Sequence, residues 1–266
     1  MRGVILDWAG TSVDHGCMGP LEPFREAFRK QKVSVSISDT RRFMGLQKMD
    51  HIREMLALPD IRERWTRQHG KEPDEETVKM LYKITEKAMV SNVANYADPI
   101  EGMPGFLTAL HGRGIKVGST TGYTAPMMKV LVPAAKARGF APDCVVCPDD
   151  VPAGRPYPWM AYLNAMRLEV YPFEAMIKIG DSVADIQEGL NAGMWTVGVT
   201  RTGNEMALTA DEVKALDPDE KAHRLKEISA KFMAAGAHYV VESAPDALEL
   251  VDTINSRLAR GESPLP

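Results

Sequence analysis

Short apolar runs that are rich in β-branched residues alternate with helical patterns along most of the chain. Six runs have this character, namely "GVILDWAG", "IKVGSTTGY", "CVVCPDDVPAG", "MIKIGDS", "WTVGVT" and "HYVVES". Helical patterns lie between or after them, as in "PGFLTALHGRG", "APMMKVLVPAAKARGF", "PYPWMAYLNAMRL" and "PDALELVDTINSRLARG". Because continuously apolar runs are typical of strands covered by helices on both faces, the pattern predicts an α/β fold with a doubly wound, mostly parallel sheet.

The alternation stops early in the chain, where the patterns are almost all helical. Four amphipathic stretches stand there, "LEPFREAFRKQ", "KMDHIREMLAL", "DIRERWTRQ" and "EETVKMLYKITEKAMV". We therefore expect an inserted all-helical domain over residues 16–97 and a core domain over residues 1–15 and 98–266. A second polar passage, residues 202–232, is also expected to be helical and carries no recognisable catalytic constellation.

Composition narrows the functional classes. Hydrophobic residues make up 44% and charged residues 26% of the 266 residues, as is ordinary for a globular protein. The net charge is -4, and Lys and Arg are spread along the chain, which argues against a nucleic-acid surface. No apolar run has the length of a membrane span and no secretory signal pattern opens the chain, so we expect a cytoplasmic protein without a membrane partner.

The three cysteines give little support to disulfide or redox chemistry. Their number is odd, which argues against a disulfide framework. Cys144 and Cys147 have redox spacing in "CVVC", but they stand in a β-branched run, where residues three apart point to opposite faces. No further zinc ligands are visible nearby. We therefore expect neither a redox nor a zinc role for this pair.

Polar residues follow four of the predicted strands. They are Asp7 after the first run, Ser119, Thr120, Thr121 and Gly122 after the second, Asp149, Asp150, Gly154 and Arg155 after the third, and Asp181 and Asp185 after the fourth. In an open parallel sheet, ligands bind beyond the carboxyl ends of the strands. The sequence therefore predicts one site at this edge, with carboxylates, hydroxyls and a cation together.

The carboxylates of this group indicate a metal ion. Asp7, Asp181 and Asp185 at one edge would repel one another unless a cation sat among them, and oxygen ligands favour a hard ion such as Mg²⁺. A plainer interpretation of "GDSVAD" stays open, in which Asp181 lies near a helix cap and Asp185 lies in the first helical turn.

Other members of the group suit a phosphoryl or phosphonyl group. Thr121 and Gly122 supply a hydroxyl and an unhindered backbone amide, and Arg155 stands just before a helix that opens with prolines. A solvated surface charge is the alternative for Arg155. With a carboxylate such as Asp7 as nucleophile, these groups describe a phosphoryl-transfer site with Mg²⁺.

The order "DWAGT", "STTG", "GRP" and "GDSVAD" resembles the four motifs of the haloacid dehalogenase superfamily. This resemblance implies a haloacid dehalogenase-like core with a helical cap, and an aspartyl intermediate on Asp7. Members usually carry a second aspartate two residues after the nucleophile, which protonates the leaving oxygen of a phosphate ester. This chain has Ala9 there, so ordinary ester hydrolysis would lack its general acid.

That alanine is typical of one branch, the phosphonoacetaldehyde hydrolases. "DWAGTSVDHGC", "FMGLQKMDHIR", "GSTTGYT", "PDDVPAGRPYPWM", "IKIGDSVADIQEGLNAGMWTVGV" and "GAHYVVES" resemble sequences of that branch. The resemblance implies hydrolysis of a carbon–phosphorus bond, giving acetaldehyde and phosphate in the degradation of 2-aminoethylphosphonate. A lysine would form an imine with the aldehyde, so that an enamine leaves instead of a carbanion.

The resemblance also assigns residues. Lys48 matches the imine-forming lysine, although an exposed helix lysine is the alternative. His51 would share a helix face with Lys48 and shuttle protons, unless its role is structural. The substrate contacts that it implies are Met44, Gly45, Cys17, Tyr123, Thr121, Gly122 and Arg155. The Mg²⁺ ligands that it implies are Asp7, the carbonyl of Ala9, Asp181 and Asp185. Asp14 is expected to brace its loop, and the expected assembly is a homodimer.

Three other functions remain as alternatives. The nearest is a capped phosphatase or phosphomutase of the same superfamily, which the missing acid at Ala9 opposes. A signalling receiver-like module would be about 100 to 150 residues long and would have no reason to carry a helical insertion. A non-catalytic binding protein on the same fold is the third, because fold alone does not determine function.

Overall fold

The central feature of the computed structural model, which describes residues 1–264, is a six-stranded parallel sheet. The strands are β1 (Gly3–Leu6), β2 (Lys116–Thr120), β3 (Cys144–Val146), β4 (Met176–Gly180), β5 (Trp195–Val199) and β6 (Tyr239–Val241). Their order is β3-β2-β1-β4-β5-β6, and every neighbouring pair is parallel. Each strand lies in one of the six apolar runs, so the predicted sheet is confirmed.

Helices cover both faces of this sheet. Ile5 packs with Ala161 of α8 (Trp159–Leu168) on one face. Val4 and Leu6 belong to the apolar cluster of the other face, which α6 (Met103–Gly112), α7 (Ala125–Ala137) and α12 (Leu248–Ala259) help to form. Since successive strand residues point to opposite faces, β1 is covered on both sides, and the doubly wound arrangement is confirmed.

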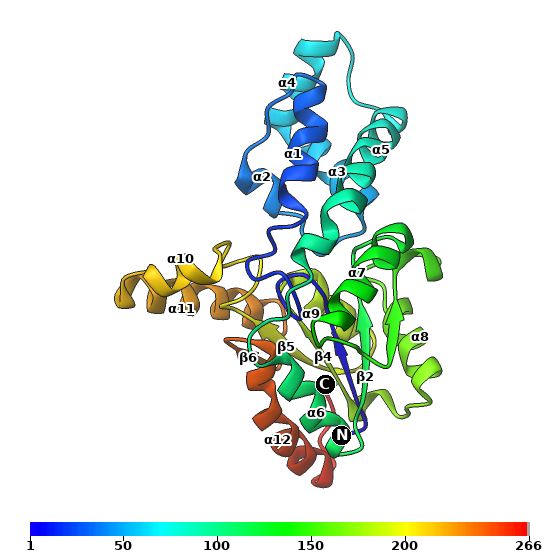
Figure 1. Ribbon diagram of the computed structural model, residues 1–266, viewed down its shortest axis with the longest axis vertical. Coiled ribbons are helices and arrows are strands. Elements are labelled where there is room, and N and C mark those ends of the chain that lie inside the picture. The colour runs from blue at the N-terminus through cyan, green and yellow to red at the C-terminus, as the bar shows by residue number, and fades with distance from the viewer. Residues whose placement is uncertain (265–266) are drawn as a thin grey trace.

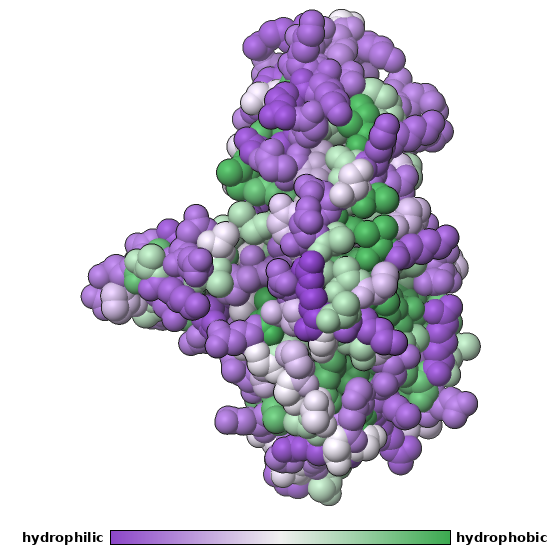
Figure 2. All heavy atoms as spheres, viewed as in Figure 1, coloured by the Kyte–Doolittle hydropathy of each residue, from purple (hydrophilic) through white to green (hydrophobic). Residues whose placement is uncertain are grey.

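The early helical patterns form a separate group of helices, α1 to α5, beyond one edge of the sheet (Figure 1). The bounds are α1 (Leu21–Lys30), α2 (Ile37–Arg41), α3 (Lys48–Ala57), α4 (Pro59–His69) and α5 (Glu75–Asn92). Four match the predicted stretches, whereas the one-turn helix α2 was not predicted. The far end of the group is covered mainly by hydrophilic residues (Figure 2). We refer to α1 to α5 as the helical group.

A second projection, formed by α10 and α11, extends sideways from the sheet (Figure 1). The bounds are α10 (Ala210–Ala215) and α11 (Pro218–Ala234), so most of the polar passage at 202–232 is helical as predicted, whereas residues 202–209 form a loop. The remaining elements are α9 (Val183–Asn191) and the 3-10 helices η1 (Val93–Tyr96), η2 (Pro148–Asp150), η3 (Phe173–Ala175) and η4 (Ala244–Ala247). Within the described residues, no helix combines the length and apolarity that a membrane crossing requires.

The register of the sheet determines where the site lies. Leu6 of β1 pairs with Ser119 of β2 and with Ile179 of β4. The strand ends are therefore level, and Asp7 and Asp181 follow adjacent strands within two residues of this row. The helical group lies beyond this edge (Figure 1), so it faces the residues that leave the strands.

Candidate active site

Three aspartates meet at the carboxyl edge of the sheet. Asp7, Asp181 and Asp185 are buried, and one carboxylate oxygen of each lies within 4.8 Å of those of the other two. The plainer interpretation of "GDSVAD" is compatible with this, because Ser182 caps α9 by accepting a hydrogen bond from the Asp185 amide. The helix start thus brings Asp185 to the other two aspartates.

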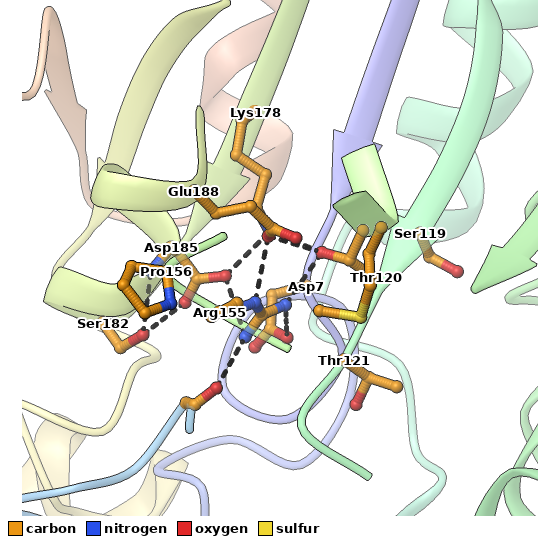
Figure 3. A network of polar contacts seen from close by, with 12 residues as sticks. Asp7, Ser119, Thr120, Thr121, Arg155, Pro156, Lys178, Ser182, Asp185 and Glu188 are labelled. Atoms are coloured by element: carbon orange, nitrogen blue, oxygen red, sulfur yellow. Dashed lines mark hydrogen bonds and ion pairs between the residues drawn. The ribbon is translucent and has the colours of Figure 1, made fainter. Parts of the chain in front are cut away.

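Asp7 and Asp185 also belong to a buried network of charges (Figure 3). The guanidinium of Arg155 contacts Asp7 at 2.7 Å, Asp185 at 3.0 Å and Glu188 at 3.0 Å. The amine of Lys178 contacts Asp185 at 2.7 Å and Glu188 at 3.2 Å. These five side chains are at most 8% exposed. The surface-charge interpretation of Arg155 is therefore wrong. Arg155 does not stand directly before a helix either, because α8 begins only at Trp159.

Thr120 joins the members of this network. Its hydroxyl accepts hydrogen bonds from Arg155 at 2.9 Å and Lys178 at 3.0 Å, and it donates one to Glu188 at 2.9 Å. The sequence analysis did not single out Lys178 or Glu188. A usable signal was present, because Lys178 is the one charged residue in "MIKIG" and Glu188 lies one helical turn after Asp185.

The site has an excess of negative charge that a divalent cation would balance. The four carboxylates of Asp7, Asp181, Asp185 and Glu188 exceed the two cations of the network by two charges when all are ionised. Burial and the neighbouring Asp7 and Asp185 raise the pKa of Asp181 well above its ordinary value. Burial also raises the pKa of Asp7, against the charge of Arg155. A hard dication among these oxygens would favour their ionised forms, so the donor set fits a metal ion.

Asp185 differs from the other two aspartates. Burial opposes its ionisation, but Arg155 and Lys178 together lower its pKa below the ordinary value. Its second oxygen accepts a hydrogen bond from the Ser182 hydroxyl at 2.5 Å. Both oxygens are therefore already engaged by protein donors, which suits a supporting role toward a cation.

Two glycines bring the helical group close to the sheet edge. A Cβ atom on Gly122 would lie 2.6 Å from the carbonyl oxygen of Leu46, and one on Gly45 would lie 2.3 Å from the Ser182 hydroxyl. Gly45 also has a φ of 92°, which other residues rarely adopt. The loop before α3 can therefore contact both sheet-edge loops only with glycine at these positions.

Lys48 is the first residue of α3, and its side chain is turned inward. The residue is 4% exposed, and its amine lies 4.7 Å from the centre of the Tyr123 ring. Burial lowers the pKa of Lys48 to about 8; Arg155 acts in the same direction, while Cys17 and Asp7 oppose it. The alternative of an exposed helix lysine is therefore wrong, and a substantial fraction of this amine is neutral near pH 8.

His51 shares the buried face of α3 with Lys48, as predicted. Its Nε2 donates a hydrogen bond to the Thr40 carbonyl at 2.7 Å, and its ring lies 4.0 Å from the Phe24 ring. Burial, with a contribution from Lys48, lowers the pKa of His51 to about 3. Among the described residues Nδ1 has no hydrogen-bond partner. The imidazole is thus neutral, and only Nδ1 is free to exchange a proton.

One small cavity joins the aspartates and the lysine. Its volume is about 20 Å³, room for about one water molecule. Most of the predicted site residues line it, namely Asp7, Ala9, Cys17, Met44, Gly45, Lys48, Thr121, Gly122, Tyr123, Arg155 and Asp181. His51 and Asp185 lie outside this lining. Burial raises the pKa of the Cys17 thiol and of the Tyr123 phenol well above their ordinary values, so both groups are neutral.

Asp14 lies beside the site and braces the chain that leaves the sheet, as predicted. Its two oxygens accept hydrogen bonds from the amides of Met18 at 3.0 Å and Gly19 at 2.8 Å.

Asp14 also lines a larger cavity of about 700 Å³ next to α10, which shares no lining residue with the small one. The "CVVC" cysteines line neither of these cavities.

The geometry agrees with comparisons to known proteins. Residues 1–193 match a family model described as haloacid dehalogenase-like hydrolase. A protein of Nitratidesulfovibrio vulgaris named phosphonoacetaldehyde hydrolase is 50% identical over all of this chain and 95% of its own length. A protein of Bacillus cytotoxicus with the same name is 46% identical over 97% of each chain. This chain belongs to the phosphonoacetaldehyde hydrolase family of haloacid dehalogenase-like hydrolases.

Solved structures of this family and its neighbours agree with the fold. A phosphonoacetaldehyde hydrolase-like protein of Oleispira antarctica superimposes with a TM-score of 0.97 at 39% identity, over 98% of this chain and 95% of its own. A β-phosphoglucomutase of Clostridium difficile has a TM-score of 0.67 at 16% identity, over 97% and 99% of the two chains. The second likeness concerns the fold alone.

Proposed function

We propose that this protein hydrolyses the carbon–phosphorus bond of phosphonoacetaldehyde to acetaldehyde and phosphate. The observation that carries the proposal is the single small cavity in which the Lys48 amine and the Asp7 carboxylate both lie, with Ala9 in place of a general acid. The names of the relatives support the substrate. A buried amine can form an imine with an aldehyde, whereas hydrolysis of a phosphate ester requires no imine because its leaving group is an oxygen.

We further propose how the chain is divided and what it binds. Residues 16–97 act as a cap domain over a core of residues 1–15 and 98–266. Mg²⁺ would be held by Asp7, the Ala9 carbonyl and Asp181, with Asp185 in support, because all these donors are oxygen atoms. When bound, the ion would orient the phosphonyl oxygens and offset their charge.

The reaction would begin at Lys48. The neutral amine adds to the aldehyde carbonyl, and loss of water gives a protonated imine, which can accept the electron pair of the carbon–phosphorus bond. A carboxylate oxygen of Asp7 attacks phosphorus as that bond breaks, giving an aspartyl phosphate and an enamine on Lys48. Protonation of the enamine carbon and hydrolysis of the resulting imine release acetaldehyde, and water releases phosphate from Asp7.

Other side chains would position the reacting groups. Thr121 and the Gly122 amide would bind phosphonyl oxygens, and Arg155 would offset the charge that develops on them. Arg155 also favours the ionised form of Asp7, against the effect of burial, and holds this carboxylate in place through its 2.7 Å contact. His51 would exchange protons through Nδ1, while Met44, Gly45, Cys17 and Tyr123 would contact the substrate.

Reductive trapping tests the imine directly. The protein is mixed with phosphonoacetaldehyde and borohydride, and the adduct is mapped by mass spectrometry. We expect a two-carbon adduct on Lys48, and a loss of turnover of at least about 10³-fold in Lys48→Arg, which keeps the charge but cannot form the imine. Lys116→Arg, at an exposed lysine on β2, is the matched control. Full turnover by Lys48→Arg would refute the proposal.

A panel of sugar phosphates tests the nearest alternative. The proposal predicts no appreciable hydrolysis of these esters, because Ala9 cannot protonate a leaving oxygen. Brisk ester hydrolysis with no turnover of the phosphonate would favour the capped phosphatase instead.

Two further expectations concern the assembly and the compartment. We propose a homodimer, which light scattering after gel filtration would test by giving twice the mass of the 29.3 kDa chain. A cytoplasmic location likewise remains a prediction, to be tested by fractionation of cells that express the protein.

A further inference from the structure

The loop that follows β5 lies between the helical group and the aspartates. The Thr202 hydroxyl donates a hydrogen bond to the Gly10 carbonyl at 2.7 Å, and the Thr202 carbonyl accepts one from the Gly16 amide at 2.8 Å. The loop is thereby held against the chain segment that leads from Asp7 into the helical group. This is the start of the polar passage at 202–232 to which the sequence assigned no role.

Arg41 of the helical group and Asn204 of this loop hold each other by two hydrogen bonds. The Arg41 guanidinium donates to the Asn204 side-chain oxygen at 3.0 Å, and the Asn204 side-chain amide donates to the Arg41 carbonyl at 3.1 Å. Arg41 also donates to the Gly16 carbonyl at 2.8 Å. Arg41 is 7% exposed and Asn204 is 5% exposed, so water competes little for these bonds.

The same loop holds a carboxylate of the proposed metal site. The backbone amide of Asn204 donates to Oδ2 of Asp181 at 2.7 Å, while the Thr11 hydroxyl donates to Oδ1 at 3.1 Å. A Cβ atom on Gly203 would lie 2.5 Å from Cβ of Asp181, so the loop backbone lies directly against this side chain. Any shift of the loop therefore changes the orientation of the Asp181 carboxylate.

We propose that Arg41 and Asn204 are positioning residues through which docking of the helical group orients Asp181 for metal binding. When the group docks, Arg41 enters the gap between the Gly16 carbonyl and Asn204, Asn204 is fixed, and its amide fixes Asp181. The inference rests on the proposed function for the metal site. It goes beyond that function because it makes metal affinity depend on a residue of α2 that does not touch the metal site.

Isothermal titration calorimetry with Mg²⁺ tests this coupling. We compare the wild-type protein with Arg41→Ala, Asn204→Ala and the double variant. Asn204→Ala keeps the backbone amide that contacts Asp181 and removes only the link to Arg41. We expect each single variant to weaken Mg²⁺ binding by about tenfold, as is usual when an indirect partner of a metal ligand is lost. We expect the double variant to be no weaker than the singles, because both changes break one link.

The sign of the effect separates positioning from electrostatics. Loss of the positive charge of Arg41 by itself would strengthen the binding of a cation, whereas the proposal predicts weaker binding. Arg42→Ala is the matched control, since Arg42 is exposed and its described ring contact is with Phe43. Arg41→Lys, which keeps the charge and can reach one acceptor, should recover part of the affinity. Thermal melting of every variant identifies any that fail to fold.

Each outcome bears on a defined claim. Unchanged Mg²⁺ affinity in folded Asn204→Ala, or fully additive losses in the double variant, would overturn the positioning role. If the wild-type protein itself bound no Mg²⁺, the proposed metal site would be wrong, and with it the function on which this inference rests.

Discussion

Burial has opposite consequences for the two reactive groups of the proposed mechanism. Lys48 must be neutral to attack an aldehyde, and burial favours its neutral form. Asp7 must be ionised to attack phosphorus, and burial disfavours its ionised form. The contact with Arg155 opposes this effect of burial, although the pKa of Asp7 remains raised. At the scale of single residues, burial therefore suits Lys48 directly, whereas Asp7 depends on the neighbouring guanidinium to offset part of its cost.

The pH dependence of imine formation follows from the lowered pKa of Lys48. Below a pKa of about 8 the neutral fraction of the amine falls about tenfold per pH unit, and above it the fraction is nearly constant. We therefore expect the rate of borohydride trapping on Lys48 to rise with pH and to level off above about 8. A rate that still increases steeply near pH 10, as for an ordinary lysine, would contradict the buried environment.

The Ala9→Asp substitution tests the interpretation of the missing acid. Ala9 lines a cavity of about 20 Å³, so a carboxymethyl group there would displace substrate and add another negative charge beside Asp7 and Asp181. We expect kcat for phosphonoacetaldehyde to fall at least about tenfold, and Ala9→Ser, which adds bulk without charge, to fall less. A faster Ala9→Asp enzyme would show that the leaving group does need a proton from this position.

At the scale of elements, much of the architecture could be predicted and some of the site could not. The β-branched runs predicted all six strands, and the strand ends predicted Asp7, Thr121 and Asp181 as neighbours. The charge pair of Lys178 and Glu188 was missed because its two halves stand on β4 and α9, and only the packing of that helix on that strand joins them. Helix α2 was missed because five residues are too few for a helical period.

Removal of one member of the pair on β4 and α9 should destabilise the fold strongly. Lys178→Met leaves Glu188 and Asp185 buried with one fewer cation, and Oε1 of Glu188 already has no hydrogen-bond partner among the described residues. We expect the free energy of unfolding to fall by about 3–5 kcal/mol in urea titrations, as when one partner of a buried pair is removed. Lys116→Met, at an exposed lysine of β2, should change it little. Equal effects of the two substitutions would contradict this.

At the scale of the whole molecule, the proposed site lies where the helical group meets the carboxyl ends of the strands. The cavity between Asp7 and Lys48 holds about one water molecule, which is too little for phosphonoacetaldehyde. We therefore expect the helical group to move away from the sheet edge when substrate enters and when products leave. The sequence could indicate the helical group and the sheet. It could not indicate how closely they approach each other, because no local pattern encodes the contact between the loop before α3 and Gly122.

A reversible disulfide across this contact tests the required opening. A Cβ atom on Gly154 would lie 3.3 Å from Cβ of Gln47, close to the usual 3.5–4.5 Å of a disulfide, and Gly154 has no positive φ to strain a cysteine. We expect the Gln47→Cys, Gly154→Cys protein to lose turnover on oxidation and to regain it with dithiothreitol. Each single cysteine variant, oxidised in the same way, should keep its activity. Undiminished turnover by the crosslinked protein would mean that substrate reaches Lys48 without separation of the two parts.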